Sequence, residues 1–182
     1  MPELQRPIEI RVERMSQLVN MLDPFPFSDR DLDPKAEDYI VGWARELPRA
    51  APITVIVHVP SGEAQSDLAR TFPLTFRHFF ANKVAQSSAD LKELIRIGRV
   101  SLLVGFGVLA LCVFTTQIVS GRLGPGPLGR FVEESLIILG WVANWRPIEI
   151  FLYDWWPIVR QRRLYRRLAA AEIAIRPARD AS

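Results

Sequence analysis

The sequence predicts an α+β membrane protein: a small cytoplasmic β-α-α-β-α module, then a two-helix transmembrane hairpin and a basic amphipathic C-terminal helix. Residues 100–121 form an uncharged run of 22 residues. At about 1.5 Å per helical residue it spans roughly 33 Å, enough to cross a bilayer. Strand and helix periodicities alternate before this run, and a second apolar segment and an arginine cluster follow it. We therefore divide the chain into residues 1–97, 98–157 and 158–182.

Charge is unevenly distributed along the 182 residues. Positions 1–97 carry a net charge of −2 and positions 98–182 a net charge of +5. The excess of basic residues accompanies the apolar segments, so we expect no nucleic-acid partner for the module. The only cysteine, Cys112, lies inside the first apolar run, where we expect a packing residue rather than a thiolate. The first ten residues lack the apolar core of a signal peptide, so we expect the chain to start in the cytoplasm.

The module begins with a strand and a short helix. Residues 8–12 alternate apolar and charged side chains, which predicts a strand with one buried face. Apolar residues between Met15 and Leu22 then recur at i, i+3, i+4 and i+7, which predicts a short amphipathic helix. A loop rich in proline and aspartate follows, and we expect Phe25 and Phe27 to anchor it to the core.

A second helix and a second strand follow the loop. Asp33 and Pro34 are typical of a helix start, and helical spacing continues to about Leu47. Residues 53–59 are apolar and rich in β-branched residues, which predicts a more central strand. A long helical connection favours a parallel pair. Because two strands leave unpaired edges, we expect the module to self-associate or to bind a partner through a strand edge or an uncovered helix face.

The chain is again helical from Ser61, with an expected interruption at Pro73. One face of this helix carries aromatic and apolar side chains that could pack on the sheet or lie on a bilayer surface: Phe72, Phe76, Phe79, Phe80 and Val84. Residues 89–99 predict a helix that connects the module to the first span.

The first span, residues 100–121, has small side chains near one side, where a second helix can approach closely. These candidate helix-packing residues are Gly98, Ser101, Gly105, Cys112 and Thr116. The glycines and prolines of residues 121–130 predict a tight turn.

The second span, residues 129–151, contains polar residues, and we expect a kink near Pro147. The intramembrane polar candidates are Glu133, Glu134, Arg146, Glu149 and Tyr153. A helix that enters the bilayer near Phe131 puts the charges near the two interfaces, and the surrounding tryptophans resemble an aromatic belt. Three interpretations stay open: a structural ion pair, a lipid-headgroup contact, and a conducting or coupling site.

Five arginines follow the second span within eight residues: Arg160, Arg162, Arg163, Arg166 and Arg167. Leu164, Leu168, Ala171 and Ile175 share one face if the helix continues, which predicts a basic amphipathic helix on an anionic leaflet. Only two arginines, Arg122 and Arg130, lie in the turn. By the positive-inside rule, we expect a multi-pass protein of the cell inner membrane with both termini cytoplasmic.

No motif specifies a reaction. The sequence contains no phosphate-binding glycine loop, HExxH, CxxC or GxSxG motif, and we expect no catalytic residues, cofactor or metal site. Its two histidines, His58 and His78, could hold a metal only if they converged with carboxylates. We therefore expect a non-enzymatic membrane scaffold or accessory subunit that forms a homo-oligomer or binds a membrane protein. The alternatives are a small oligomeric channel or transporter component and an enzyme that acts on lipid headgroups.

Overall fold

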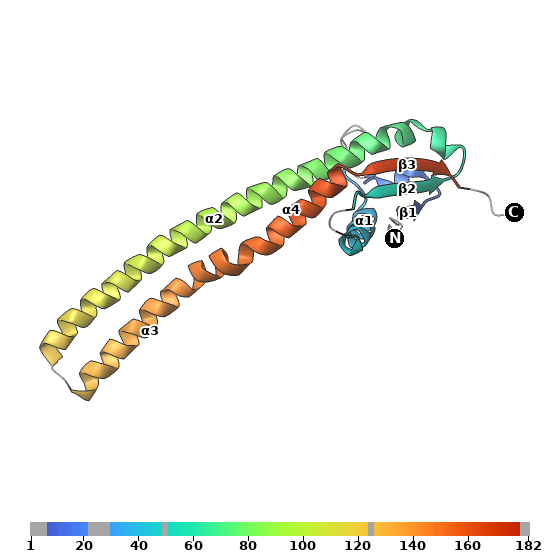
Figure 1. Cartoon of the computed structure of the whole chain (residues 1–182). Coiled ribbons are helices and arrows are strands. Elements are labelled where there is room, and N and C mark those ends of the chain that lie inside the picture. Colours follow the sequence, from blue (N-terminus) through green and yellow to red (C-terminus); the bar gives the residue numbers. More distant parts are fainter. Residues whose placement is uncertain (1–6, 22–29, 49–50, 124–125, 179–182) are drawn as a thin grey trace. The chain divides into compact units, whose positions relative to one another are not determined.

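The computed structural model describes residues 7–21, 30–48, 51–123 and 126–178 (Figure 1). The chain separates into two compact units. The first, which we call the sheet unit, combines Met1–Ser87 with Arg160–Ser182, and the second, the hairpin unit, is Ser88–Val159. The hairpin unit is thus an insertion between two segments that fold together.

Three parallel strands form the sheet in the order β1-β2-β3. They are β1 (Ile8–Arg11), β2 (Thr54–Val59) and β3 (Glu172–Pro177). The first two confirm the predicted strands and their parallel pairing, with Ile8 opposite Val55. The third strand was not predicted, and it extends the sheet on the other side of β2.

The prediction of a basic helix through residues 158–182 is wrong in its second part. Helix α4 (Trp155–Ala169) ends, and after a turn the chain enters β3. The amide of Glu172 donates to the carbonyl of Ile53 (3.0 Å), and the pairing with β2 follows. Ile173 and Ile175 alternate with polar or small residues, so a strand packs both isoleucines against the core, whereas a helix would direct them to different sides.

One hydrophobic core joins α1 (Pro34–Glu46), α4 and the first part of α2 (Asp67–Leu123) to a single face of the sheet. The phenylalanines of α2 are buried there, which confirms that they pack on the sheet rather than on a bilayer: Phe72, Phe76, Phe79 and Phe80. From α4, Tyr165 and Leu168 enter the same core, and the rings of Phe80 and Tyr165 lie 5.9 Å apart.

Helix α2 continues through Pro73, contrary to the expected interruption. A proline inside a helix costs about 3 kcal/mol because it removes a backbone hydrogen bond and crowds the preceding turn. The neighbouring Phe72 and Phe76 are almost fully buried. Burial of each such side chain contributes about 1.5–3 kcal/mol, so the two together offset the cost of the proline.

Two other local predictions have different outcomes. Asp33 caps α1 by accepting hydrogen bonds from the amides of Lys35 (2.9 Å) and Ala36 (3.4 Å), as expected. The helix predicted between Met15 and Leu22 is only a 3-10 turn, η1 (Met15–Leu18). It stops because Val19 forms an antiparallel bridge with Leu32. The predicted anchors Phe25 and Phe27 lie outside the described residues.

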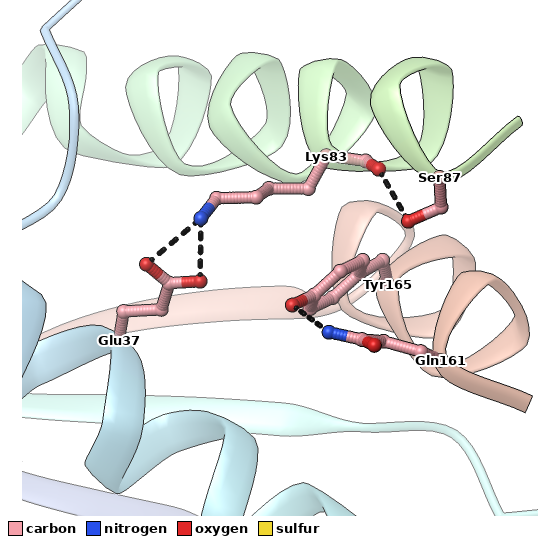
Figure 2. A network of polar contacts seen from close by, with 5 residues as sticks. All are labelled: Glu37, Lys83, Ser87, Gln161 and Tyr165. Carbon is pink, nitrogen blue, oxygen red and sulfur yellow. Dashed lines mark hydrogen bonds and ion pairs between the residues drawn. The ribbon is translucent and has the colours of Figure 1, made fainter. Parts of the chain in front are cut away.

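One ion pair joins two helices of the sheet unit, and two hydrogen bonds close to it lie within single helices (Figure 2). The ammonium of Lys83 lies 2.9 Å from Oε1 of Glu37 on α1 and 3.1 Å from its Oε2, and it also lies over the ring of Phe79. The hydroxyl of Ser87 donates to the carbonyl of Lys83 (2.9 Å). On α4, the amide of Gln161 donates to the hydroxyl of Tyr165 (2.6 Å).

The hairpin unit is helical. The second part of α2 is followed by α3 (Pro127–Glu149), the π-helix η3 (Ile150–Asp154) and the start of α4. Two helical stretches, Asp67–Val119 and Pro127–Ala169, are long and apolar enough to cross a membrane. Only 11% and 17% of their most apolar windows are buried, whereas the core helix of a soluble protein is mostly buried. These features are compatible with a membrane protein.

The composite sheet unit makes a prediction about folding. A chain that joins residues 1–87 to residues 160–182 through a flexible linker of about ten residues, which reaches roughly 17 Å, should fold without the hairpin. Residues 1–97 alone should not form the same structure, because they lack β3 and the core residues Tyr165 and Leu168. Dispersed amide signals in NMR spectra and a cooperative thermal transition would distinguish the two chains. A fully folded 1–97 fragment would contradict the composite unit.

Candidate functional site

The hairpin unit contains a small charged cluster near the end of α3. The guanidinium of Arg146 lies 3.3 Å from Oε2 of Glu149 and 3.4 Å from Oδ2 of Asp154. The indole of Trp145 donates to the other oxygen of Glu149 (3.0 Å). The cluster therefore has one cation, two carboxylates and an aromatic donor, and both carboxylates contact the guanidinium of Arg146.

Pro147 and the π-helix determine which side chains enter this cluster. Pro147 has no amide hydrogen to donate to the carbonyl of Ala143. Three residues later the helix widens into η3, which begins at Ile150 and ends at Asp154. In a regular α-helix Arg146 and Asp154 would be about 12 Å apart along the axis. The widened turns and the long arginine side chain bring the two charges together. The kink near Pro147 stays a prediction.

The other predicted polar residues of the second span lie apart from the cluster. Glu133 and Glu134 are exposed on α3, and Glu134 precedes Arg146 by 12 residues, about 18 Å of helix. Tyr153 is exposed within η3. The structure thus brings the predicted residues Arg146 and Glu149 together. Asp154 and Trp145 join them, whereas Glu133 and Glu134 do not.

Small residues of α2 contact the return helices within the hairpin unit. A side chain on Gly98 would lie 2.8 Å from Ile150, and one on Gly105 would lie 2.7 Å from the amide oxygen of Asn144. The Asn144 amide group donates to the carbonyls of Gly105 (3.1 Å) and Gly140 (2.9 Å). Close approach of the backbones thus allows a hydrogen bond between the helices.

The other predicted helix-packing residues differ from one another in their burial. Cys112 is buried, and Ser101 and Thr116 are half-buried. Cys112 and Thr116 line an apolar groove of about 360 Å³, together with Leu109, Leu136 and Trp141. The hydroxyl oxygen of Thr116 is buried and has no hydrogen-bond partner within the described part of the chain.

The five predicted membrane-surface arginines belong to the sheet unit and differ in their surroundings. Arg160, Arg163 and Arg166 are exposed on α4, whereas Arg162 and Arg167 are half-buried. The guanidinium of Arg167 donates to the carbonyls of Pro48 and Ala51, both at 2.9 Å. Arg167 therefore holds the segment before β2, and three exposed arginines are left for a surface role.

Comparisons of the chain with family models, with curated proteins and with solved structures found no match. Function must therefore be argued from the geometry of these residues. Among the residues that the structure describes, no group of three histidine, cysteine, aspartate or glutamate side chains could hold a metal ion. His58 instead lies 3.3 Å from Glu9 on the neighbouring strand.

Three residues that matter in the hairpin unit were not among the predicted site residues: Asn144, Trp145 and Asp154. The four-residue spacing of Trp145 and Glu149 is a helical contact that could have been read directly. Asn144 is an amide inside an apolar helix and could have been identified as an interhelical donor. Asp154 had no such signal, because its contact with Arg146 depends on the π-helix.

Two glycines of α2 test the close helix contact. Gly105→Ala should weaken the packing of α2 on α3, because the new methyl group would also lie 3.0 Å from the carbonyl oxygen of Ala143. We expect a loss of about 1–3 kcal/mol, the usual cost of overpacking. Gly107→Ala is the matched control, since no atom lies within 4 Å of its added carbon. Thermal unfolding in detergent should show a lower midpoint for Gly105→Ala alone, and equal midpoints would contradict the contact.

Proposed function

We propose that the chain is a non-enzymatic integral membrane scaffold or accessory subunit whose sheet unit faces the cytoplasm and binds a second copy or a partner protein. The observation that carries this proposal is the composite sheet unit, which begins before the apolar hairpin and is completed after it. The hairpin serves as a membrane anchor, and the sheet unit provides the surface that binds a second copy or a partner protein.

The exposed surface of the hairpin unit supports a membrane location. Large apolar side chains on α2 and α3 are more than half exposed, including Leu103 (74%), Phe131 (70%) and Trp141 (65%). A continuous apolar surface of this kind is costly in water and stable among lipid chains. Exposed aromatic residues near the charged cluster, such as Trp145 and Trp156, fit the interface between hydrocarbon and headgroups.

Connectivity supports the proposed topology independently of the positive-inside rule. One compact unit contains the residues before α2 leaves it and the residues after α4 returns to it. If the two apolar helices cross a bilayer, both of their outer ends must therefore emerge on the same side. The arginine excess on α4 favours the cytoplasm as that side, and Arg160, Arg163 and Arg166 are available to anionic lipids.

The sheet unit offers surfaces that suit a protein partner. A sheet of three parallel strands has two outer edges, on β1 and β3, and such edges favour pairing with another chain. On α1, Tyr39 and Trp43 are nearly half exposed and their rings lie 6.2 Å apart. Exposed tyrosine and tryptophan are enriched among the residues that contribute most to protein interfaces.

A pair of reporter fusions tests the topology. A fluorescent protein fused after Ser182 should be active in the cytoplasm, and alkaline phosphatase inserted in the turn between α2 and α3 should be active outside it. Loss of fluorescence after Ser182, or an inactive phosphatase between α2 and α3, would contradict the topology. Replacing Arg160, Arg163 and Arg166 with glutamine should shift the balance toward inverted insertion, because these residues contribute to the positive charge on the inner side.

Copurification tests the proposed scaffold role. Two differently tagged copies of the full chain, coexpressed and extracted in mild detergent, should copurify with each other or with a partner protein in a fixed ratio. A matched chain that retains only residues 88–159 between the tags should lose this association, since it lacks the sheet unit. Recovery of a single copy with no partner would contradict the role, and equal recovery by the hairpin alone would move the interface to α2 and α3.

The second candidate is a small oligomeric channel or transporter component that uses the charged residues of the second span. The cluster of Arg146, Glu149 and Asp154 beside a π-helix favours this candidate, because π-helical turns are frequent at functional sites. Arg146→Leu combined with Glu149→Leu separates the two functions. A scaffold should retain copurification, whereas a transporter should lose ion flux in proteoliposomes and still assemble.

A further inference from the structure

The face of the sheet opposite the core carries a row of three basic side chains. Arg11 on β1 pairs in register with His58 on β2, and His58 pairs with Arg176 on β3. The core contains Ile10, Val57, Val59 and Ile175, the sequence neighbours of these residues, so all three basic side chains lie on the other face. One basic side chain from each strand therefore occupies the same level of the sheet.

This row is unusual in its charge balance. Arg11 and Arg176 are exposed, and within the described part of the chain neither guanidinium makes an ion pair or hydrogen bond. Among the described residues, the acidic contact of the row is between His58 Nε2 and Glu9 Oε2, at 3.3 Å. Within that part of the chain, the two guanidinium groups are thus available to an external anion.

The distance between the side chains of the row suits the binding of an oxyanion between them. Strands lie about 4.8 Å apart, so the α-carbons of Arg11 and Arg176 are about 10 Å apart with His58 between them. Two long side chains that carry planar donor groups can close on one tetrahedral anion from either side, and guanidinium groups bind phosphate oxygens in a bidentate manner. The imidazole between them adds a third donor.

We propose that Arg11, His58 and Arg176 form a binding site for a phosphate group. The phosphate belongs to a soluble phosphorylated compound or to a lipid headgroup, and both offer the same oxygens to the row. Glu9 lowers the affinity because its carboxylate lies beside His58 and repels the anion. The site uses side chains on the face of the sheet, whereas pairing at a strand edge uses the backbone of β1 or β3, and it does not use the arginines of α4.

Histidine NMR of the full chain tests the proposal. The sequence contains only His58 and His78, so a chain labelled with ¹³C at histidine Cε1 gives two signals in zwitterionic detergent. Titration with inorganic phosphate at constant ionic strength should move the signal of His58 in a saturable manner and leave that of His78 in place. A second arm uses nanodiscs of phosphatidylcholine with and without phosphatidic acid. Saturation by inorganic phosphate supports a soluble ligand, and a shift of His58 only with phosphatidic acid supports a lipid headgroup.

Variants give the expected direction of each effect. Arg11→Gln combined with Arg176→Gln should raise the apparent dissociation constant at least about tenfold, because two charge-assisted contacts are lost. The control variant, Arg70→Gln combined with Arg77→Gln, removes the same charge from exposed positions of α2. It should change the apparent dissociation constant less than about twofold. Glu9→Gln should tighten binding.

Three results would overturn the proposal: no shift of His58 with either probe, parallel unsaturated shifts of His58 and His78, or equal weakening by the two double variants. The Glu9→Gln variant keeps the proposal testable if Arg11→Gln and Arg176→Gln disturb folding, because it retains both arginines and predicts a gain rather than a loss. Weaker binding by Glu9→Gln would therefore also count against the site.

Discussion

The hydrogen bonds between β2 and β3 join the two ends of the chain into one sheet, and the rest of the organisation depends on them. β3 is synthesised only after both apolar helices, so β2 lacks one neighbour until the hairpin is complete. Closing a loop of this length costs conformational entropy. The antiparallel return of α3 along α2, fixed by the contact between Gly105 and Asn144, reduces the freedom of that loop before the sheet closes.

The two units are stabilised by different interactions. The sheet unit buries phenylalanines and branched aliphatic side chains, so the hydrophobic effect is its main source of stability. If lipid surrounds the helices of the hairpin unit, that driving force is absent between them, and close packing and hydrogen bonds take its place. The glycines of α2 and the amide of Asn144 are suited to those interactions, while their large apolar neighbours face outward.

The first strand and the start of α1 follow from local sequence signals and could be predicted, whereas features set by distant contacts could not. The alternation of Ile8 and Ile10 and the cap at Asp33 are local, and both predictions were confirmed. β3 was missed because Ile175 continues the helical spacing of Leu168 and Ala171, and its partner strand is more than 100 residues away. Arg167 was grouped with lipid-facing arginines because its acceptors, on Pro48 and Ala51, are equally remote. The contact between Arg146 and Asp154 depends on a π-helix that the sequence does not reveal.

The proposed phosphate site is linked to the closure of the sheet by its position. Arg11, His58 and Arg176 come from the three different strands, and Arg176 joins the others only when β3 is paired. A ligand that contacts all three strands binds only the closed sheet, so its binding free energy adds to the stability of that state. The closed sheet also holds both ends of the hairpin. A phosphate compound bound at this face would therefore stabilise the closed sheet, to which both ends of the hairpin are joined.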